Sequence, residues 1–147
     1  MTSSFRIRPE LLGWRVPESL RNDQPAWGPG KTGERVDFLI VAPWCPDCQV
    51  LASRRSWEAF RRPGAQQAWL VVEFAPERDA VKFREALGLD WPLLSGTAEK
   101  SRVAWVQARF RQIRAACGDD RNWGLPTWVS ARWEHGDLVV ERFESDF

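Results

Sequence analysis

The chain has 147 residues, which is enough for one domain with a hydrophobic core of its own. Its 21 basic and 20 acidic side chains nearly cancel, which argues against a nucleic-acid partner, and no secretory signal or membrane-spanning segment is recognisable. Three cysteines without an export signal favour a reducing compartment, so we expect a cytoplasmic protein in which a Cys-x-x-Cys pair is catalytic or metal-binding.

Residues 1–35 carry the weakest pattern of the chain. Apolar side chains within 9–20 allow one or two helical turns, but Gly13 and Pro17 prevent a long helix. The glycines and prolines of residues 22–33 predict a loop. We expect residues 1–35 to form an N-terminal extension that packs on a domain formed by residues 36–147.

A buried strand followed by a helix is predicted for residues 36–60. Residues 36–43 are rich in branched apolar side chains with one charge, which is typical of a strand covered on both faces. Residues 49–60 contain no glycine or proline and predict a helix of several turns. Trp-Cys-Pro-Asp-Cys stands between them at residues 44–48. The two thiols therefore lie where a strand turns into a helix.

The two cysteines are predicted to have different roles. Cys45 is at the N-cap, where unpaired backbone N–H groups and the helix dipole favour a thiolate. Pro46 suits the first helical position, and Cys48 lies one turn further along, less exposed but able to form a disulfide with Cys45. We predict that Cys45 attacks a substrate disulfide and that Cys48 resolves the mixed disulfide.

Strands and helices alternate in the next part of the chain. Residues 69–74 predict a second buried strand, which makes a right-handed crossover and a parallel sheet with the first strand and helix. Residues 77–87 predict an amphipathic helix that ends at Gly88, and residues 90–96 predict a connection.

A long helix and a hairpin complete the predicted elements. Residues 98–117 repeat apolar side chains at helical spacing, and Cys117 on this apolar stripe is predicted to be a buried structural thiol. Residues 127–133 and 138–143 predict the two strands of a hairpin, with His135, the single histidine, exposed at its tip.

The order of these elements over residues 36–143, about three quarters of the chain, resembles the thioredoxin superfamily. The resemblance implies an α/β, thioredoxin-like fold with a central mixed sheet flanked by helices. Residues 44–48 are similar to the motif of cytosolic thioredoxin-related proteins and of some bacterial thioredoxin-like proteins, which carry the same five residues.

The resemblance also implies a loop beside the cysteine pair. Leu125, Pro126 and Thr127, directly before the hairpin, look like the cis-proline loop of the family. In the family this loop keeps metal ions away from the cysteines, and the residue before the proline pairs with substrate as an added strand. Residues 91–92, another X-Pro pair, precede a helix instead of a hairpin, so we prefer Pro126.

Three more residues are expected to shape this site. Trp44, directly before the nucleophile, joins Leu125, Pro126 and Thr127 in binding substrate. Pro46 and Asp47 replace the Gly-Pro of common thioredoxins and modulate the pair. Asp47 stabilises the helix start, but its negative charge opposes a thiolate, so the two effects partly cancel.

Three departures from the thioredoxin pattern stand out. Thioredoxins carry a buried acid six residues before the first cysteine, where this chain has Leu39, and Asp37 on the same strand face is the candidate substitute. Only four residues follow the last predicted strand, so we expect no C-terminal helix and expect residues 1–35 to cover the open sheet face. Two helices precede the cis-proline loop in place of one, which enlarges the rim of the site.

These observations predict a thiol-disulfide oxidoreductase that works through a Cys45–Cys48 disulfide without another cofactor. We expect a monomer whose partners are disulfide-containing proteins or small thiols and an unidentified reductant, without nucleic acid or membrane. The alternative is a thioredoxin-like binding or scaffolding domain without turnover, which the altered motif and Leu39 support. Zinc binding is a weaker alternative, because only Cys117 and His135 remain as further ligands.

Overall fold

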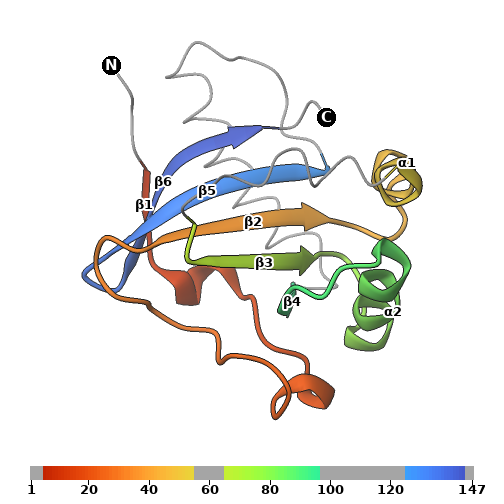
Figure 1. Ribbon diagram of the computed structural model, residues 1–147, viewed down its shortest axis with the longest axis horizontal. Coiled ribbons are helices and arrows are strands. Elements are labelled where there is room, and N and C mark those ends of the chain that lie inside the picture. Colours follow the sequence, from red (N-terminus) through yellow and green to blue (C-terminus); the bar gives the residue numbers. More distant parts are fainter. Residues whose placement is uncertain (1–4, 55–64, 97–124, 145–147) are drawn as a thin grey trace.

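A six-stranded mixed sheet forms the centre of the computed structural model (Figure 1). The structure describes residues 5–54, 65–96 and 125–144, with the side chains of Phe5, Arg54 and Phe143 excepted. The strands lie in the order β1-β6-β5-β2-β3-β4. Their bounds are β1 (Phe5–Ile7), β2 (Arg35–Val41), β3 (Gln67–Val72), β4 (Leu93–Ser95), β5 (Thr127–Glu134) and β6 (Asp137–Glu144). The helices are α1 (Pro46–Arg54), α2 (Glu77–Leu87) and two short 3-10 helices, η1 (Pro9–Leu12) and η2 (Glu18–Leu20).

The strand β2 lies inside the sheet, between β5 and β3. Its side chains from Val36 to Val41 are therefore buried on both faces of the sheet. It runs parallel to β3, with Phe38 opposite Trp69, and antiparallel to β5, with Ile40 opposite Thr127. The predicted parallel crossover through α1 and the predicted β5–β6 hairpin are therefore confirmed. The parallel pair on one side of β2 and the hairpin on the other make the fold thioredoxin-like, as expected.

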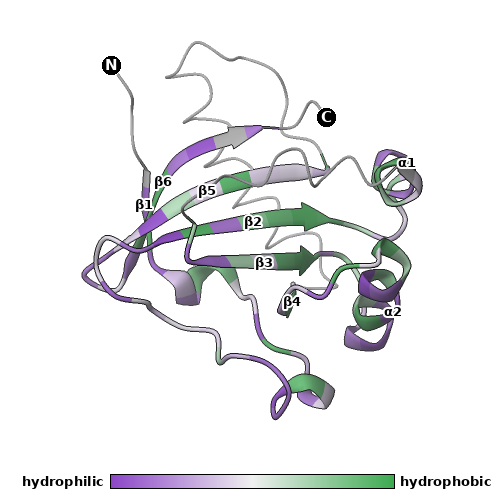
Figure 2. Cartoon of the chain, viewed as in Figure 1, coloured by the Kyte–Doolittle hydropathy of each residue, from purple (hydrophilic) through white to green (hydrophobic). Residues whose placement is uncertain are grey.

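The sheet separates two apolar layers. On the face that carries α1 and α2, Leu39, Val41 and Val72 pack with Leu51 and Leu87. Both helices lie at the end of the sheet where β2 and β3 finish (Figure 1), and Figure 2 shows apolar residues concentrated in those ends of the strands. The cysteine pair belongs to this layer, so its surroundings are largely apolar.

The opposite layer is covered by the segment that precedes β2. Trp27 is surrounded by four aromatic rings, with centroid distances of 6.1 Å to Trp14, 5.8 Å to Phe38, 5.5 Å to Trp69 and 5.7 Å to Trp133. Tilted and edge-to-face contacts at these distances stabilise buried aromatic pairs. The tryptophans of this cluster therefore have a structural role, because they close the second face of the sheet; they are Trp14, Trp27, Trp69 and Trp133.

The same segment also seals the outer edge of β4. The Leu93 N–H donates to Gln24 Oε1 at 3.0 Å, and Gln24 Nε2 donates to the Leu93 carbonyl at 2.8 Å. Arg15 and Ser95 exchange two backbone hydrogen bonds of 3.0 and 2.8 Å. An exposed strand edge can pair with other chains, so these contacts protect a vulnerable part of the sheet.

Two strands were missed by the sequence analysis. The connection predicted for residues 90–96 contains β4, which pairs in parallel with β3, and residues 5–7 form β1, which pairs with β6. Each has only three residues, too few for an alternating pattern to show, and each depends on pairing with a distant part of the chain.

The helix α2 has the predicted bounds, and Gly88 ends it with a φ of 68°, in the left-handed conformation that glycine adopts without strain. The predicted helix at 98–117, with Cys117, lies outside the described residues, as does the end of the helix predicted for 49–60. No helix in the described ranges has both the length and the apolar composition that crossing a lipid bilayer requires.

Candidate functional site

Cys45 lies in the turn between the end of β2 and the start of α1. Its N–H donates to the Ala42 carbonyl at 3.1 Å, and its own carbonyl accepts the helical hydrogen bond of the Gln49 N–H at 3.1 Å. Pro46 is the first residue of α1. The Cys45 side chain is therefore next to the unpaired N–H groups of the first helical turn, which favour negative charge.

Cys48 lies one turn further along α1 and is more deeply buried. Its exposed fraction is 0%, against 7% for Cys45, and both side chains are free thiols. Burial raises the pKa of the Cys48 thiol far above its usual value. A hydrogen bond with the Ala42 backbone lowers this pKa, whereas a hydrogen bond with Cys45 and the negative charges of Cys45 and Asp47 raise it further. Cys48 therefore holds its proton to a higher pH than an ordinary thiol does.

The loop before β5 lies against Cys45. The Cys45 thiol donates to the Leu125 carbonyl at 3.4 Å, and the peptide bond between Leu125 and Pro126 is cis. Pro126 and Thr127 are buried, and Thr127 is opposite Ile40 in the β2–β5 pairing. The sheet therefore holds this loop next to the end of β2, from which the chain continues to the cysteines.

The other site residues predicted from the sequence lie at the rim. Trp44 is 54% exposed, and Pro46 and Asp47 are exposed in the first turn of α1. The Trp44 ring lies 5.7 Å from the ring of Phe74 at an interplanar angle of 55°. The structure thus brings Leu125 against Cys45 and leaves Trp44, Pro46 and Asp47 exposed next to the cysteines in the chain, and it adds Phe74 as a neighbour of Trp44.

Phe74 was predicted to be the last residue of a strand, and this was wrong. The strand β3 ends two residues earlier at Val72, and Phe74 has a φ of 60°. A glycine or asparagine would have signalled a left-handed residue, whereas phenylalanine gives no such signal.

Asp37 does not lie beside the cysteines. It is fully buried in β2, opposite Ser130 of β5, and it shares a strand face with Leu39. Asp37 is four residues before Val41, the last residue of the strand, which corresponds to about 13 Å of strand. An acid at position 39 would be about 7 Å closer to the thiols, so Asp37 is poorly placed to exchange a proton with Cys48 directly.

A second buried carboxylate, which the sequence analysis missed, follows β3. The Glu73 N–H donates to the Val41 carbonyl at 2.9 Å, and Glu73 Oε1 accepts a hydrogen bond of 2.5 Å from Trp14 Nε1. Its contact with Trp14 places this side chain in the layer opposite the cysteines. Glu73 therefore connects the N-terminal segment to the end of the sheet where the site lies.

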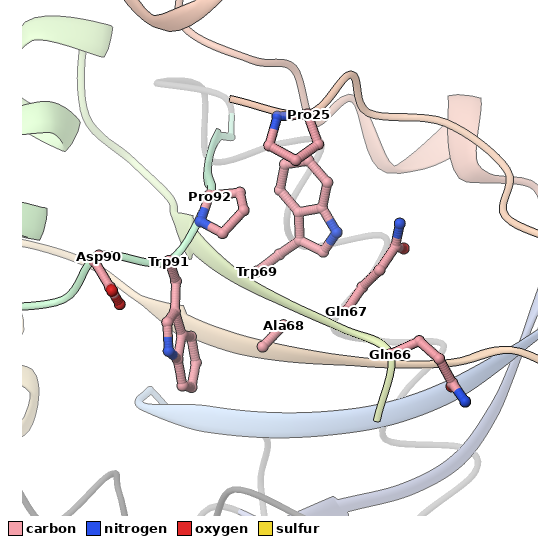
Figure 3. Close-up of a pocket in the computed structure, with 8 residues that line it drawn as sticks. All are labelled: Pro25, Gln66, Gln67, Ala68, Trp69, Asp90, Trp91 and Pro92. Carbon is pink, nitrogen blue, oxygen red and sulfur yellow. The ribbon is translucent and has the colours of Figure 1, made fainter. Parts of the chain in front are cut away.

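Other polar groups lie away from the thiols. His135 is exposed in the turn between β5 and β6, at the far end of the sheet (Figure 1), and no cluster of three potential metal-ligating side chains occurs within the described ranges. A cavity of about 310 Å³ is lined by Pro25, Trp69 and Trp91, among other residues (Figure 3). It adjoins the start of β3, whereas the cysteines follow the end of β2, so this cavity is separate from the thiol site.

No model of a known protein family matches this sequence, and no match to it was found among curated proteins. Among solved structures, the chain is similar to MTB DsbF, with 17% identity, a TM-score of 0.46, and coverage of 92% of this chain and 89% of that one. A secreted Mycobacterium tuberculosis disulfide oxidoreductase gives 16% identity, a TM-score of 0.47 and coverage of 95% and 90%. StoA from Bacillus subtilis gives 10% identity, a TM-score of 0.47, and coverage of 99% of this chain and 89% of that one. These likenesses are distant, and the fold is assigned from the sheet topology.

Proposed function

We propose that this thioredoxin-like chain is a thiol-disulfide oxidoreductase that reduces the disulfides of proteins or small molecules. The observation that carries the proposal is the arrangement of two free thiols at the start of α1. Cys45 precedes the first helical residue and touches the Leu125 carbonyl, while Cys48 is buried one turn behind it. This arrangement supplies a nucleophile at the rim and a second thiol in reserve.

The proposed reaction consists of two thiol-disulfide exchanges. The Cys45 thiolate attacks one sulfur of the substrate disulfide, a bond forms between Cys45 and that sulfur, and the other substrate sulfur leaves as a thiolate that takes a proton. Cys48 then loses its proton and attacks the Cys45 sulfur, so that a Cys45–Cys48 disulfide forms and the second substrate thiolate leaves. The substrate gains the two electrons that the dithiol loses, and an external thiol reductant restores the dithiol.

The raised pKa of Cys48 supports this division of roles. Burial keeps Cys48 protonated, which suits a resolving thiol held in reserve. Cys45 lies at the helix N-terminus, a position that favours a thiolate nucleophile. The buried thiol also lies one helical turn from the nucleophile, so it can reach a mixed disulfide on Cys45 without an opening of the fold.

Leu125 is the proposed docking point for the substrate backbone. Its carbonyl is 3.4 Å from the Cys45 sulfur, and it therefore faces the place where the mixed disulfide would form. Once Cys45 is bonded to substrate, a substrate N–H can take the place of the thiol as donor to this carbonyl, in the manner of an added strand. The reducing direction, a cytoplasmic location and a monomeric state also belong to the proposal.

Reduction of insulin in the presence of dithiothreitol tests this function. We expect the wild-type protein to accelerate the reduction and the Cys45→Ser variant to lose the acceleration. Cys117→Ser is a matched control, because the proposed reaction does not use this thiol. Equal rates for wild type and Cys45→Ser would refute the proposal.

A binding domain without turnover is the second candidate. The observation that favours it is the buried, apolar Leu39 at the position of the family acid, together with the distance of Asp37 from the thiols. In that case Cys45 would exchange with a disulfide once, but the wild-type protein would show no repeated turnover with excess dithiothreitol. Repeated turnover would exclude this candidate.

A further inference from the structure

Phe74 is held in an unusual backbone conformation beside the thiol site. Its φ of 60° lies in the left-handed region, where a bulky L-residue is strained and glycine is not. In the described ranges the other non-glycine residue with a positive φ is His135, in the hairpin turn before Gly136, where a left-handed conformation is usual. Strained residues of this kind concentrate at functional sites, so the benefit of keeping phenylalanine at position 74 needs an explanation.

The Phe74 side chain connects the core to the rim of the site. It is half-buried and packs against the apolar layer that contains Cys45 and Cys48. Its outer contact is the ring of Trp44, at a centroid distance of 5.7 Å. The turn after β3 therefore places the half-buried ring of Phe74 behind the exposed ring of Trp44. Trp44 directly precedes the nucleophile Cys45 in the sequence. We call these two side chains the Trp44–Phe74 platform.

The helix α1, which begins at the thiols, exposes one large apolar and one acidic side chain. Trp44 and Val50 are two of the three large apolar side chains that are exposed in the described parts of the chain, at 54% and 44%. Val50 lies one turn beyond Pro46 on the exposed surface of α1. The charge nearest to the nucleophile in sequence is the exposed carboxylate of Asp47, which opposes the approach of an anionic substrate.

We propose that Phe74 is a positioning residue for Trp44 and that the Trp44–Phe74 platform selects polypeptide disulfides with an apolar or aromatic side chain next to the attacked cysteine. Small anionic disulfides such as oxidised glutathione are poor substrates, because they gain no apolar contact and are repelled by Asp47. This inference rests on the proposed oxidoreductase function and names its substrate class.

Two matched peptides test the selection. Acetyl-Phe-Cys-Gly-amide and acetyl-Ser-Cys-Gly-amide, each joined by a disulfide to 2-thiopyridine, release the same chromophore, and hydroxyethyl disulfide measures reactivity without a side chain to select. For the wild type we expect a kcat/KM about fivefold higher for the Phe peptide than for the Ser peptide, as an aromatic contact of ordinary strength gives. Oxidised glutathione should react more slowly than hydroxyethyl disulfide.

Variants separate positioning from a general structural role. Trp44→Ala and Phe74→Gly should each reduce the preference for the Phe peptide to less than about twofold, mainly through KM, and the rate for the Phe peptide should fall more than the rate for hydroxyethyl disulfide. The double variant should lose no more than Trp44→Ala alone, because both changes remove one platform. Phe74→Asn, which also tolerates a positive φ, replaces Phe74→Gly if that variant does not fold.

Three results would overturn the inference. They are equal rates of the wild type for the two peptides, full preference in a folded Phe74 variant, and an equal loss of rate for hydroxyethyl disulfide and the Phe peptide in that variant. Failure of the oxidoreductase function itself is distinguishable, because the wild type would then not react with hydroxyethyl disulfide at all, and this would overturn both proposals.

Discussion

The stability of the reduced protein at alkaline pH depends on the burial of Cys48. This thiol is fully buried, and burial, the hydrogen bond with Cys45 and nearby negative charge raise its pKa in the folded state. In the unfolded chain the same thiol has a pKa of about 8.5. The folded state therefore keeps a proton that the unfolded state loses, so the Cys48 contribution to stability is complete below about pH 8.5 and declines as the pH rises toward the folded pKa.

The magnitude follows from the ionisation of one thiol in the unfolded chain. At pH 7.5 this ionisation favours the unfolded state by about 0.1 kcal/mol, and at pH 9.5 by about 1.4 kcal/mol. Between these two pH values we expect the free energy of unfolding of the reduced wild type to fall by about 1.3 kcal/mol more than that of Cys48→Ala, in which this group is absent.

Urea unfolding under reducing conditions, followed by tryptophan fluorescence, measures the difference. Wild type and Cys48→Ala are compared at both pH values, so that the titration of groups common to the two proteins cancels. An equal decline in both proteins would show that Cys48 ionises as easily in the folded chain as in the unfolded one, and it would refute the assignment of Cys48 as the buried, protonated thiol.

Two further predictions concern the contacts that close the sheet. Gln24→Ala removes both hydrogen bonds to Leu93, and we expect the free energy of unfolding in urea to fall by about 1–3 kcal/mol. The exposed control Asn22→Ala should change it by less than about 0.5 kcal/mol. Equal effects of the two substitutions would contradict the sealing of β4 by Gln24. Trp133→Ala removes a fully buried ring and should lower the free energy of unfolding by about 3–5 kcal/mol. Trp44→Ala removes an exposed ring and should lower it by less than about 1 kcal/mol. Similar melting temperatures of the two variants would argue against a structural tryptophan layer.

The elements that could be predicted from the sequence are those with local signals. The helix α2 has an apolar stripe and a terminal glycine, β2 is a long apolar run, and β5 leads into the turn at Gly136. By contrast, β4 is a strand only because it pairs with β3 and because Gln24, far away in sequence, completes its outer edge. Contacts of that kind depend on the tertiary structure and leave no trace in a short stretch of sequence.

The site shows the same division. The Cys-x-x-Cys motif between a strand and a helix was sufficient to place Cys45 before the first helical residue, because this position follows from local structure. The contact of Cys45 with the Leu125 carbonyl depends on the pairing of β2 with β5, and the partnership of Trp44 with Phe74 depends on a left-handed residue that the sequence does not signal. The sequence does not signal that β2 ends at Val41, and the distance of Asp37 from the thiols depends on where this strand ends.

Mass spectrometry of a Cys48→Ser variant tests the central claim most directly. In this variant the second exchange is blocked, so incubation of the reduced protein with two identical peptides joined by a disulfide should leave one peptide bound to Cys45 in a stable mixed disulfide that dithiothreitol removes, while the other peptide leaves as a free thiol. The matched Cys45→Ser variant should form little or no adduct, because Cys48 is buried and keeps its proton. An adduct on another residue, or equal adducts on both variants, would contradict the assignment of Cys45 as the nucleophile.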